Sequence, residues 1–360
     1  MDPHKQDILN PTESGFQPRI IAWEVTRSCN LNCVHCRASS RFGPYDQELD
    51  TGEALEVLDQ IREVGTPIII LTGGEPLLRK DIFELAKYGT DRGLRMVMGS
   101  NGTLITANVA RRIEESGIKR VSISLDGSTR ESHDAFRKVH GAFDRAMKGI
   151  SSLKDQGVAF QINTTITRRN LAELQEILDL AGRIGAVAHH IFLLVPTGRA
   201  REMVNQELSA RDYENTLHWF YRQHATVSLE LKATCAPQYY RILQQEASSR
   251  AQNAHAKTMG LDAVTRGCLA GTSYCFISHV GTVQPCGYLE IDSGDLRKAP
   301  FSQIWHNSTV FNDLRDFSKY KGKCGRCEYI AVCGGCRARA YEAYGDYLAE
   351  EPLCAYNPEP

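Results

Sequence analysis

Three closely spaced cysteines near the start of the chain restrict its fold and chemistry more than any other feature. Cys29, Cys33 and Cys36 form a C-x3-C-x2-C run that directly follows a strand-like stretch. Three thiolates can bind three irons of a cubic 4Fe–4S cluster. Because no fourth cysteine is near in the sequence, the fourth iron would stay open to a ligand that is not protein. The run therefore predicts a catalytic cluster rather than a simple electron store.

The same run resembles the cluster motif of the radical S-adenosylmethionine (SAM) enzymes, with His35 before the third cysteine. The resemblance implies that the open iron chelates the amino and carboxylate groups of SAM. It also implies that one electron cleaves SAM to methionine and a 5′-deoxyadenosyl radical, which abstracts hydrogen from an unactivated C–H bond. In such enzymes cofactor and cluster supply the chemistry, while the protein supplies position and shielding.

Composition agrees with a large cytoplasmic protein. The 360 residues are 42% hydrophobic, enough for two domains with a large core. The net charge of −1 predicts neither nucleic acid nor a membrane surface as a partner. Apolar runs such as Ile191–Val195 are too short to cross a bilayer, and residues 1–18 lack the apolar core of a signal peptide. Clusters of this kind are oxygen-sensitive, so we expect an anaerobic host.

A second group of cysteines fills the C-terminal quarter of the chain. Of twelve cysteines, eight lie there, and in a cytosolic chain of this length they indicate metal rather than disulfides. Eight sulfurs would satisfy two closed 4Fe–4S clusters. Two C-x2-C pairs also have zinc-ribbon spacing, so zinc is the alternative. Zinc would leave four of these cysteines unexplained: Cys268, Cys275, Cys286 and Cys354.

The C-terminal spacing resembles the SPASM domain of many radical SAM enzymes. The resemblance implies an inner cluster, nearer the catalytic domain, held by Cys268, Cys275, Cys286 and Cys336. It implies an outer cluster held by Cys324, Cys327, Cys333 and Cys354. The last pair is separated by two residues where three are more usual, which leaves the allotment of Cys333 and Cys336 open.

Between residues 19 and 225, short β-rich runs alternate with amphipathic helices. The predicted strands are Ile20–Val25, Ile68–Leu71, Leu94–Met98, Arg120–Leu125, Ala159–Thr164 and His189–Leu194. The predicted helices are Gly52–Val64, Asp81–Arg92, Ala107–Ser116, Ala142–Gln156 and Leu171–Ile184. Six β-α units predict an α/β fold with a parallel sheet, and the resemblance implies a partial (β/α)6 barrel. Ligands of such sheets bind at the C-terminal strand ends.

Three further segments complete the predicted organisation. Residues 1–18 form an N-terminal extension, and residues 226–265 form a bridge that contains a polar helix-like run, Gln238–Lys257. Residues 266–360 are rich in Gly and Cys and short of long elements. Such a segment buries little apolar area and needs metal to hold it.

The loop after the second strand contains Gly73, Gly74 and Glu75. Glycines let a backbone approach a ligand closely, and a carboxylate can accept from an ammonium group. By resemblance, this loop binds the amino group of SAM; an ordinary tight turn is the alternative.

Polar residues after the third and fourth strands resemble family positions that line the ribose and methionine of SAM. They are Ser100, Asn101, Ser124 and Asp126. Helix capping and loop formation are the alternative roles, since these residue types favour both.

The last two strands and the first cysteine run supply further candidates. Gln161 and Asn163 share one face of the fifth strand, which predicts a contact with SAM or substrate. Leu194 with Val195 either flanks the adenine or packs in the core, and His35 either stacks on the adenine or supports a ligand from behind. Of His189 and His190, at most one faces the barrel interior.

The substrate class is predicted by likeness to radical SAM enzymes of haem biosynthesis. The runs that carry this resemblance are Lys232–Arg241 in the bridge, Ile21–Cys29 and Gly260–Cys268. The resemblance as a whole covers residues 19–354. It implies iron-coproporphyrin III as substrate, with two of its four propionates decarboxylated oxidatively to vinyl groups to give haem b. Each event would return one electron, which explains an auxiliary cluster, and SAM cleavage would need a small donor such as flavodoxin or ferredoxin.

Three rival functions remain open at this point. One is a sibling enzyme that removes acetate groups from didecarboxysirohaem. Another is a peptide-maturing SPASM enzyme, although about 18 residues before the first strand leave no room for a precursor-binding domain. The third is a non-catalytic electron-transfer or zinc protein.

Candidate substrate contacts follow from the four carboxylates of the macrocycle. Arginine pairs bidentately with carboxylates, and one or two of Arg27, Arg37, Arg199 and Arg241 are expected to reach a propionate. Cys235, left over from the three clusters, is either an axial ligand of the substrate iron or an inert buried residue. Tyr239 and Tyr240 either stack on the macrocycle or pack in the core.

Overall fold

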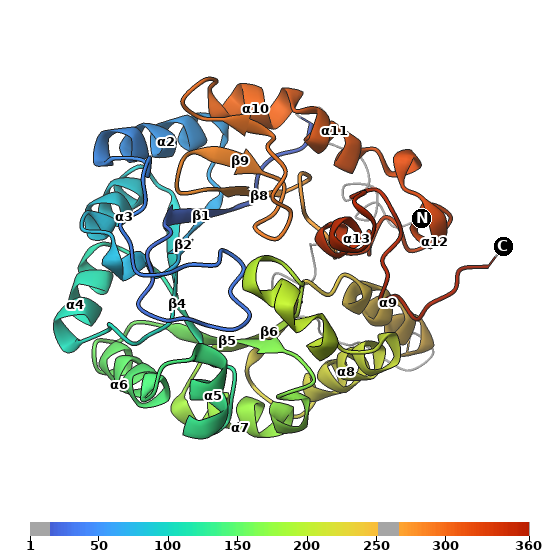
Figure 1. Ribbon diagram of the computed structural model, residues 1–360, viewed down its shortest axis with the longest axis horizontal. Coiled ribbons are helices and arrows are strands. Elements are labelled where there is room, and N and C mark those ends of the chain that lie inside the picture. The colour runs from blue at the N-terminus through green and yellow to red at the C-terminus, as the bar shows by residue number, and fades with distance from the viewer. Residues whose placement is uncertain (1–14, 251–265, 360) are drawn as a thin grey trace.

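A single curved β-sheet organises the molecule. The computed structural model describes residues 15–250 and 266–359. Its sheet has ten strands in the order β10-β9-β8-β1-β2-β3-β4-β5-β6-β7. Figure 1 shows the strands surrounding a central space, with helices arranged outside them. Among the described residues, no helix is long and apolar enough to cross a membrane.

The first six strands are parallel neighbours in chain order, as predicted for a partial barrel. They are β1 (Ile20–Thr26), β2 (Ile68–Gly73), β3 (Arg95–Ser100), β4 (Val121–Ser124), β5 (Phe160–Ile166) and β6 (Ala188–Leu193). Helices connect successive strands on the outer side: α2 (Thr51–Val64), α3 (Ile82–Asp91), α4 (Ala107–Glu115), α5 (Arg130–Arg137), α6 (Ala142–Asp155) and α7 (Leu174–Ile184). Short 3-10 turns η2 (Pro76–Leu78) and η3 (Leu171–Glu173) precede α3 and α7.

The sheet continues beyond both edges of the six-stranded unit. After η4 (Gly198–Gln206) and α8 (Ala210–Gln223), strand β7 (Glu230–Thr234) pairs in parallel with β6. At the other edge, β8 (Tyr274–Ile277) pairs in parallel with β1, and β9 (Thr282–Gln284) and β10 (Gly294–Asp295) follow as antiparallel strands. The predicted bridge thus contains a barrel strand, and the cysteine-rich segment extends the same sheet.

The remaining described elements belong to the bridge and to the cysteine-rich segment. They are α9 (Gln238–Arg250), α10 (Phe301–Asn307), α11 (Thr309–Arg315), η6 (Phe317–Lys319), α12 (Gly322–Gly325) and α13 (Arg337–Tyr344). Part of the predicted N-terminal extension, the end of the run Gln238–Lys257 and most of Gly260–Cys268 lie outside the described residues. The predicted domain boundaries remain predictions.

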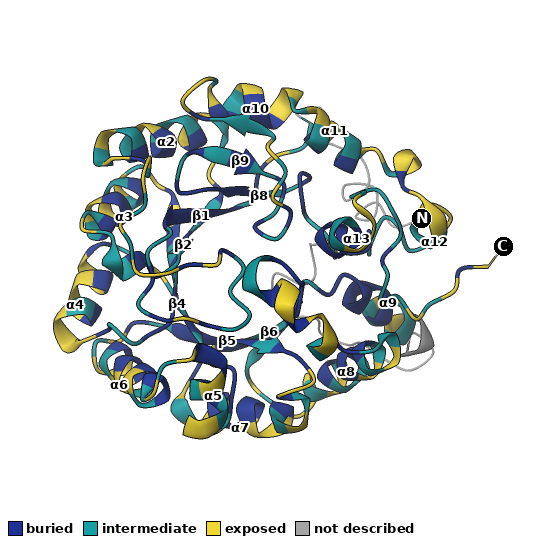
Figure 2. Cartoon of the chain, in the orientation of Figure 1, coloured by how far each residue is buried: buried dark blue, intermediate teal, exposed yellow. Residues whose placement is uncertain are grey.

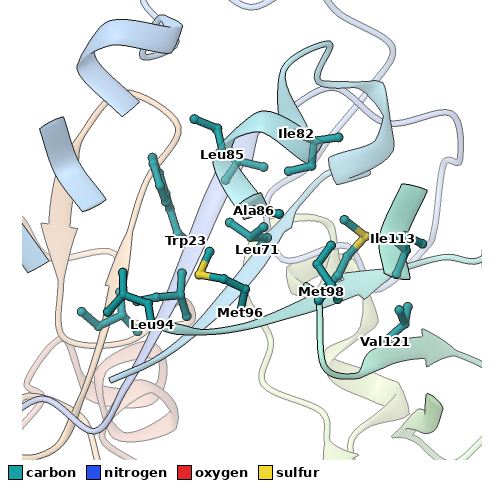
Figure 3. Close-up of a cluster of buried hydrophobic side chains, with 14 of the residues drawn as sticks. Trp23, Leu71, Ile82, Leu85, Ala86, Leu94, Met96, Met98, Ile113 and Val121 are labelled. Atoms are coloured by element: carbon teal, nitrogen blue, oxygen red, sulfur yellow. The ribbon is translucent and has the colours of Figure 1, made fainter. Parts of the chain in front are cut away.

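The main apolar core lies between the sheet and its outer helices. Trp23, Leu71 and Met98 point outward from the strands and pack against Leu85 of α3 and Ile113 of α4 (Figure 3). The helices outside the barrel strands, α2 to α8, bury one face and expose the other (Figure 2). Alternate residues of each strand therefore serve this core, and the others face the barrel interior.

Two loops at the C-terminal end of the sheet meet through a glycine. Gly74 N donates to Thr26 O and Glu75 N donates to Ser28 O, each at 2.8 Å. A Cβ at Gly74 would lie 2.3 Å from Ser28 O. The glycine thus allows the β2 loop to approach the backbone that leads into Cys29.

Gly74→Ala should destabilise the fold because its methyl group would collide with backbone that cannot move away. We expect a loss of about 2 kcal/mol in unfolding free energy, measured by urea denaturation. Gly65→Ala is the matched control, since a Cβ there meets nothing within 4 Å and its φ of 164° is extended. Equal stability of the two variants would contradict this account.

Candidate active site

The barrel interior holds one large cavity of about 920 Å³. It is lined by inward-facing residues of β1 to β8, by the first cysteine loop and by part of the cysteine-rich segment. Its volume lies at the upper end of small-molecule sites in proteins. Cys29, Cys33 and Cys36 line it together with Cys235, Cys268, Cys286 and Cys336.

Each sulfur of the first cysteine group accepts a hydrogen bond from an N–H group. Leu31 N donates to Cys29 Sγ at 3.4 Å, and Ser40 N donates to Cys36 Sγ at 3.3 Å. Arg137 Nη1 donates to Cys33 Sγ at 3.4 Å. Burial raises the pKa of Cys29 to about 12. Such donors stabilise the ionised sulfur that metal binding requires.

Arg137 links the cysteine group to a buried acid. Its Nη2 lies 2.5 Å from Asp126 Oδ2, and Thr165 N donates to Asp126 Oδ1 at 2.8 Å. Burial would raise the pKa of Asp126, but Arg137 beside it holds that pKa below its ordinary value. His35 Nε2 lies 3.5 Å from Asp126 Oδ2, and burial lowers the pKa of His35 to about 4. The histidine is therefore neutral near pH 7.

The predicted SAM loop is arranged around the carboxylate of Glu75. Ser100 Oγ donates to Glu75 Oε1 at 2.9 Å, and Asn101 N donates to Oε2 at 2.8 Å. Burial raises the pKa of Glu75 to about 7. Gly74, Ser100 and Asn101 line the cavity, as does Gly73, but Glu75 lies behind them and ties the β2 loop to the β3 loop.

Strands β4 to β6 supply a polar wall. Ser124, Gln161 and Asn163 line the cavity, and Gln161 Nε2 donates to Asn163 Oδ1 at 2.9 Å. His190 also lines it, with its Nδ1 2.9 Å from Gln161 Nε2. His189 is buried on the opposite face, 3.0 Å from Thr164 Oγ1, as strand alternation requires.

Several predicted contact residues lie away from the cavity. Arg27 pairs with Glu24 at 2.8 Å, and Leu194 packs with Ala200 and Met203. Tyr239 is buried, with its hydroxyl 2.7 Å from His224 Nε2. These three serve packing and pairing in the described structure, whereas Tyr240 lines the cavity.

The cavity's two candidate arginines differ in pairing. Arg37 Nη2 lies 2.6 Å from Glu24 Oε2, so a carboxylate already balances its charge. Arg199 donates to Cys33 O and Ser40 O, each at 2.8 Å. Its Nη2 is buried with no hydrogen-bond partner among the described residues.

The C-terminal cysteines separate into two groups. Cys324, Cys327, Cys333 and Cys354 line a small outer hollow with Arg241, which pairs with Glu214 at 2.6 Å. Cys336 lines the main cavity with Cys268 and Cys286, so Cys333 and Cys336 belong to different groups. Cys275 joins neither group. The expected inner set included Cys275, but its side chain faces the outer core, beside Ile21 of β1.

These groups have the chemistry of iron–sulfur ligands. Thiolates hold the irons of 4Fe–4S clusters, and each group supplies three or four cysteines. Within residues 15–250 and 266–359, no three His, Cys, Asp or Glu side chains converge to hold one metal ion.

Sequence reasoning missed several side chains of the site. Among them, Arg137 ends a short helix, Lys232 lies on the unpredicted strand β7, and Tyr288 lies two residues after Cys286; all three line the cavity. Alternation along Glu230–Thr234 carries a usable signal, since Leu231 and Ala233 are apolar and Lys232 between them is polar.

Comparison with known proteins gives the class. Residues 23–181 match the family model of the radical SAM superfamily, and residues 268–337 match that of the SPASM iron–sulfur cluster-binding domain. The crystal structure of Streptococcus suis SuiB bound to its precursor peptide SuiA has a TM-score of 0.74 at 16% identity, covering 95% of this chain and 77% of that one. Its likeness concerns the fold. The chain is thus a radical SAM enzyme with a SPASM domain, which indicates SAM and 4Fe–4S clusters as cofactors.

Curated relatives define the family within that class. "AdoMet-dependent heme synthase" of Nitratidesulfovibrio vulgaris is 56% identical, covering 94% of this chain and 93% of that protein. The protein of the same name from Methanosarcina barkeri is 52% identical over 95% of this chain and 97% of its own length. "Fe-coproporphyrin III synthase" of M. barkeri is 32% identical, covering 93% of this chain and 87% of that protein. The chain belongs to the family of the AdoMet-dependent haem synthases, and its role lies in haem biosynthesis.

Arg137→Met should destabilise the protein and weaken iron binding, because Asp126 would be buried without its cation. We expect a loss of about 3 kcal/mol in unfolding free energy and a reduced iron content after anaerobic reconstitution. Arg145→Met, at an exposed arginine, is the control and should change stability by at most about 0.5 kcal/mol. Full iron occupancy and unchanged stability in Arg137→Met would contradict the assignment.

Glu75 should make stability depend on pH between about 4.5 and 7. In that window the unfolded chain releases a proton that folded Glu75 keeps, so stability falls as pH rises and levels off above the folded pKa. Relative to Glu75→Gln, the wild type should lose up to about 3 kcal/mol between pH 4.5 and 7.5, measured by urea denaturation. Exposed Glu114→Gln should follow the wild type; a parallel curve for Glu75→Gln would refute the prediction.

Proposed function

We propose that the protein oxidatively decarboxylates two propionates of iron-coproporphyrin III to vinyl groups, giving haem b. The observation that carries the proposal is the continuous cavity, which joins the first cysteine group to three cysteines of the C-terminal segment. Such a space suits SAM and a macrocycle together, with an electron acceptor beside them. The names and identities of the relatives favour this reaction over the acetate-removing alternative.

The proposed cofactors are SAM and three 4Fe–4S clusters. Cys29, Cys33 and Cys36 would hold the SAM-binding cluster, and the inner and outer C-terminal groups would each hold an auxiliary cluster. When bound, these groups supply hydrogen abstraction and electron transfer. The cavity residues orient SAM and substrate and keep water from the reacting carbon.

Each propionate must lose CO2, one hydrogen atom and one electron. The hydrogen leaves the carbon next to the ring, CO2 leaves from the carboxylate, and the remaining electrons form the double bond. Cleaved SAM would supply the 5′-deoxyadenosyl group that takes up the hydrogen atom, and an auxiliary cluster is the proposed electron acceptor. A flavodoxin or ferredoxin would supply the electron that SAM cleavage consumes.

Cationic side chains in the cavity would hold the propionates. The unpartnered Nη2 of Arg199 is buried, and the backbone oxygens of Cys33 and Ser40 fix the rest of its guanidinium. Lys232 is half-buried on β7 and lines the same cavity. Of the predicted arginines, Arg199 therefore fits a carboxylate contact better than Arg27 or Arg241, which pair with Glu24 and Glu214.

Mass spectrometry of the tetrapyrrole tests the reaction. Anaerobically reconstituted protein with SAM and a reductant should remove two formic-acid equivalents from iron-coproporphyrin III and form 5′-deoxyadenosine. Didecarboxysirohaem should stay unchanged. Loss of acetate from didecarboxysirohaem, with iron-coproporphyrin III untouched, would replace the proposal by its sibling reaction. The variant with Cys29, Cys33 and Cys36 changed to alanine should form neither product.

Lys232→Met should weaken substrate binding because a propionate loses a charge-assisted contact. We expect KM for iron-coproporphyrin III to rise about tenfold, corresponding to about 1.4 kcal/mol. Exposed Lys119→Met is the control and should leave KM unchanged. An unaltered KM in Lys232→Met would remove this residue from the proposed propionate site.

A further inference from the structure

Cys235 lies with the inner cysteine group rather than apart from it. It follows β7 directly and lines the main cavity with Cys268, Cys286 and Cys336. Cys235 and Cys286 both pack against a small buried cluster that contains Cys336. All three inner cysteines are electrostatic neighbours of the Cys235 sulfur. Four sulfurs from four separate segments therefore meet on one side of the cavity.

Cys275 faces the other side of the sheet. Its neighbours Tyr274 and Phe276 line the cavity, so the pleat of β8 points Cys275 toward the outer core. Cys275 is paired with Ile21, fully buried and part of the main apolar core. The electrostatic neighbour of its sulfur is Arg315. A side chain in this position cannot reach the cavity unless the register of β8 shifts by one residue.

The backbone at Cys235 is held in an unusual conformation. Its φ is +56°, in the left-handed region that costs a residue with a Cβ of order 1 kcal/mol. Two buried side chains fix its carbonyl: Tyr213 Oη donates to Cys235 O at 2.9 Å, and Arg339 Nη2 donates at 3.2 Å. The fold therefore tolerates a less stable backbone conformation at Cys235, which places its thiol directly after the end of β7.

We propose that Cys235, and not Cys275, is the fourth ligand of the inner auxiliary cluster, with Cys268, Cys286 and Cys336. The inference rests on the proposed auxiliary clusters and is independent of the proposed substrate. It removes Cys235 as the axial ligand of the substrate iron, because its sulfur would be bound to the cluster. It gives Cys275 the role of a small apolar core residue.

Iron and acid-labile sulfide analysis tests the assignment without any activity assay. The background is the variant with Cys29, Cys33 and Cys36 changed to alanine, so that only auxiliary clusters remain; it should bind about eight irons per chain. Adding Cys235→Ala should lower this to about four, or, if a three-ligand cluster survives, change the electron paramagnetic resonance spectrum of the reduced inner cluster. Adding Cys275→Ala should leave iron content and spectrum unchanged.

Three results would overturn the inference. One is loss of iron in Cys275→Ala with retention in Cys235→Ala, and another is an unchanged spectrum and iron content in both variants. The third is loss of iron in both Cys235→Ala and Cys275→Ala. This third result counts only if Cys275→Val, which refills the core, also loses iron while circular dichroism shows a folded chain. A background with only about four irons would instead refute the proposal of two auxiliary clusters, before either single variant is measured.

Discussion

Metal binding needs ionised cysteine sulfurs, but burial disfavours this charged form. Buried arginines beside the cysteines offset that effect in all three cysteine groups. Burial raises the pKa of Cys29 and of Cys286 to about 12. Arg137 contacts Cys33, Arg337 contacts Cys324 at 3.5 Å, and Arg339 is an electrostatic neighbour of Cys336. A buried cation beside the sulfur favours the thiolate.

These arginines are in turn fixed by groups that belong to the fold. Arg137 is paired with Asp126 after β4, and Arg339 is paired with Glu351 at 3.2 Å. Arg337 donates to Tyr347 O at 3.1 Å and to Ala349 O at 2.7 Å. Arg137 also joins the end of α5 to the first cysteine loop through Cys33, and Arg339 joins the C-terminal segment to the barrel through Leu194 O and Cys235 O. Metal binding and loop order are then parts of one arrangement. The expectation that residues 266–360 bury little apolar area is wrong, since Phe301 and Trp305 lie in the main core.

The barrel was predictable because its strands are short apolar runs between amphipathic helices, the usual pattern of buried parallel strands. Helix α5 was not predicted, since its buried residues include His133 and Arg137 and it has no clear apolar stripe. Strand β7 presents Glu230, Lys232 and Thr234 to the cavity, and this polar composition resembles that of a loop. Helix α8 could have been found, because Tyr213, Leu217 and Phe220 follow helical spacing after Ser209.

The predicted site residues that reach the cavity are those for which motif and pleat agree. The C-x3-C-x2-C group, the glycine loop and the alternating Gln161 and Asn163 all reach the cavity. Spacing between cysteines cannot show which face of a strand a residue occupies, which is why Cys275 was included in the expected inner set. The bulky neighbours Tyr274 and Phe276 carry that information only once their strand is known to pair with β1.

The pairing of β8 with β1 has a consequence for how the protein is made. During synthesis, β1 leaves the ribosome about 250 residues before β8. Until β8 has been made, one edge of the nascent barrel has no partner strand, and its backbone groups are open to wrong partners.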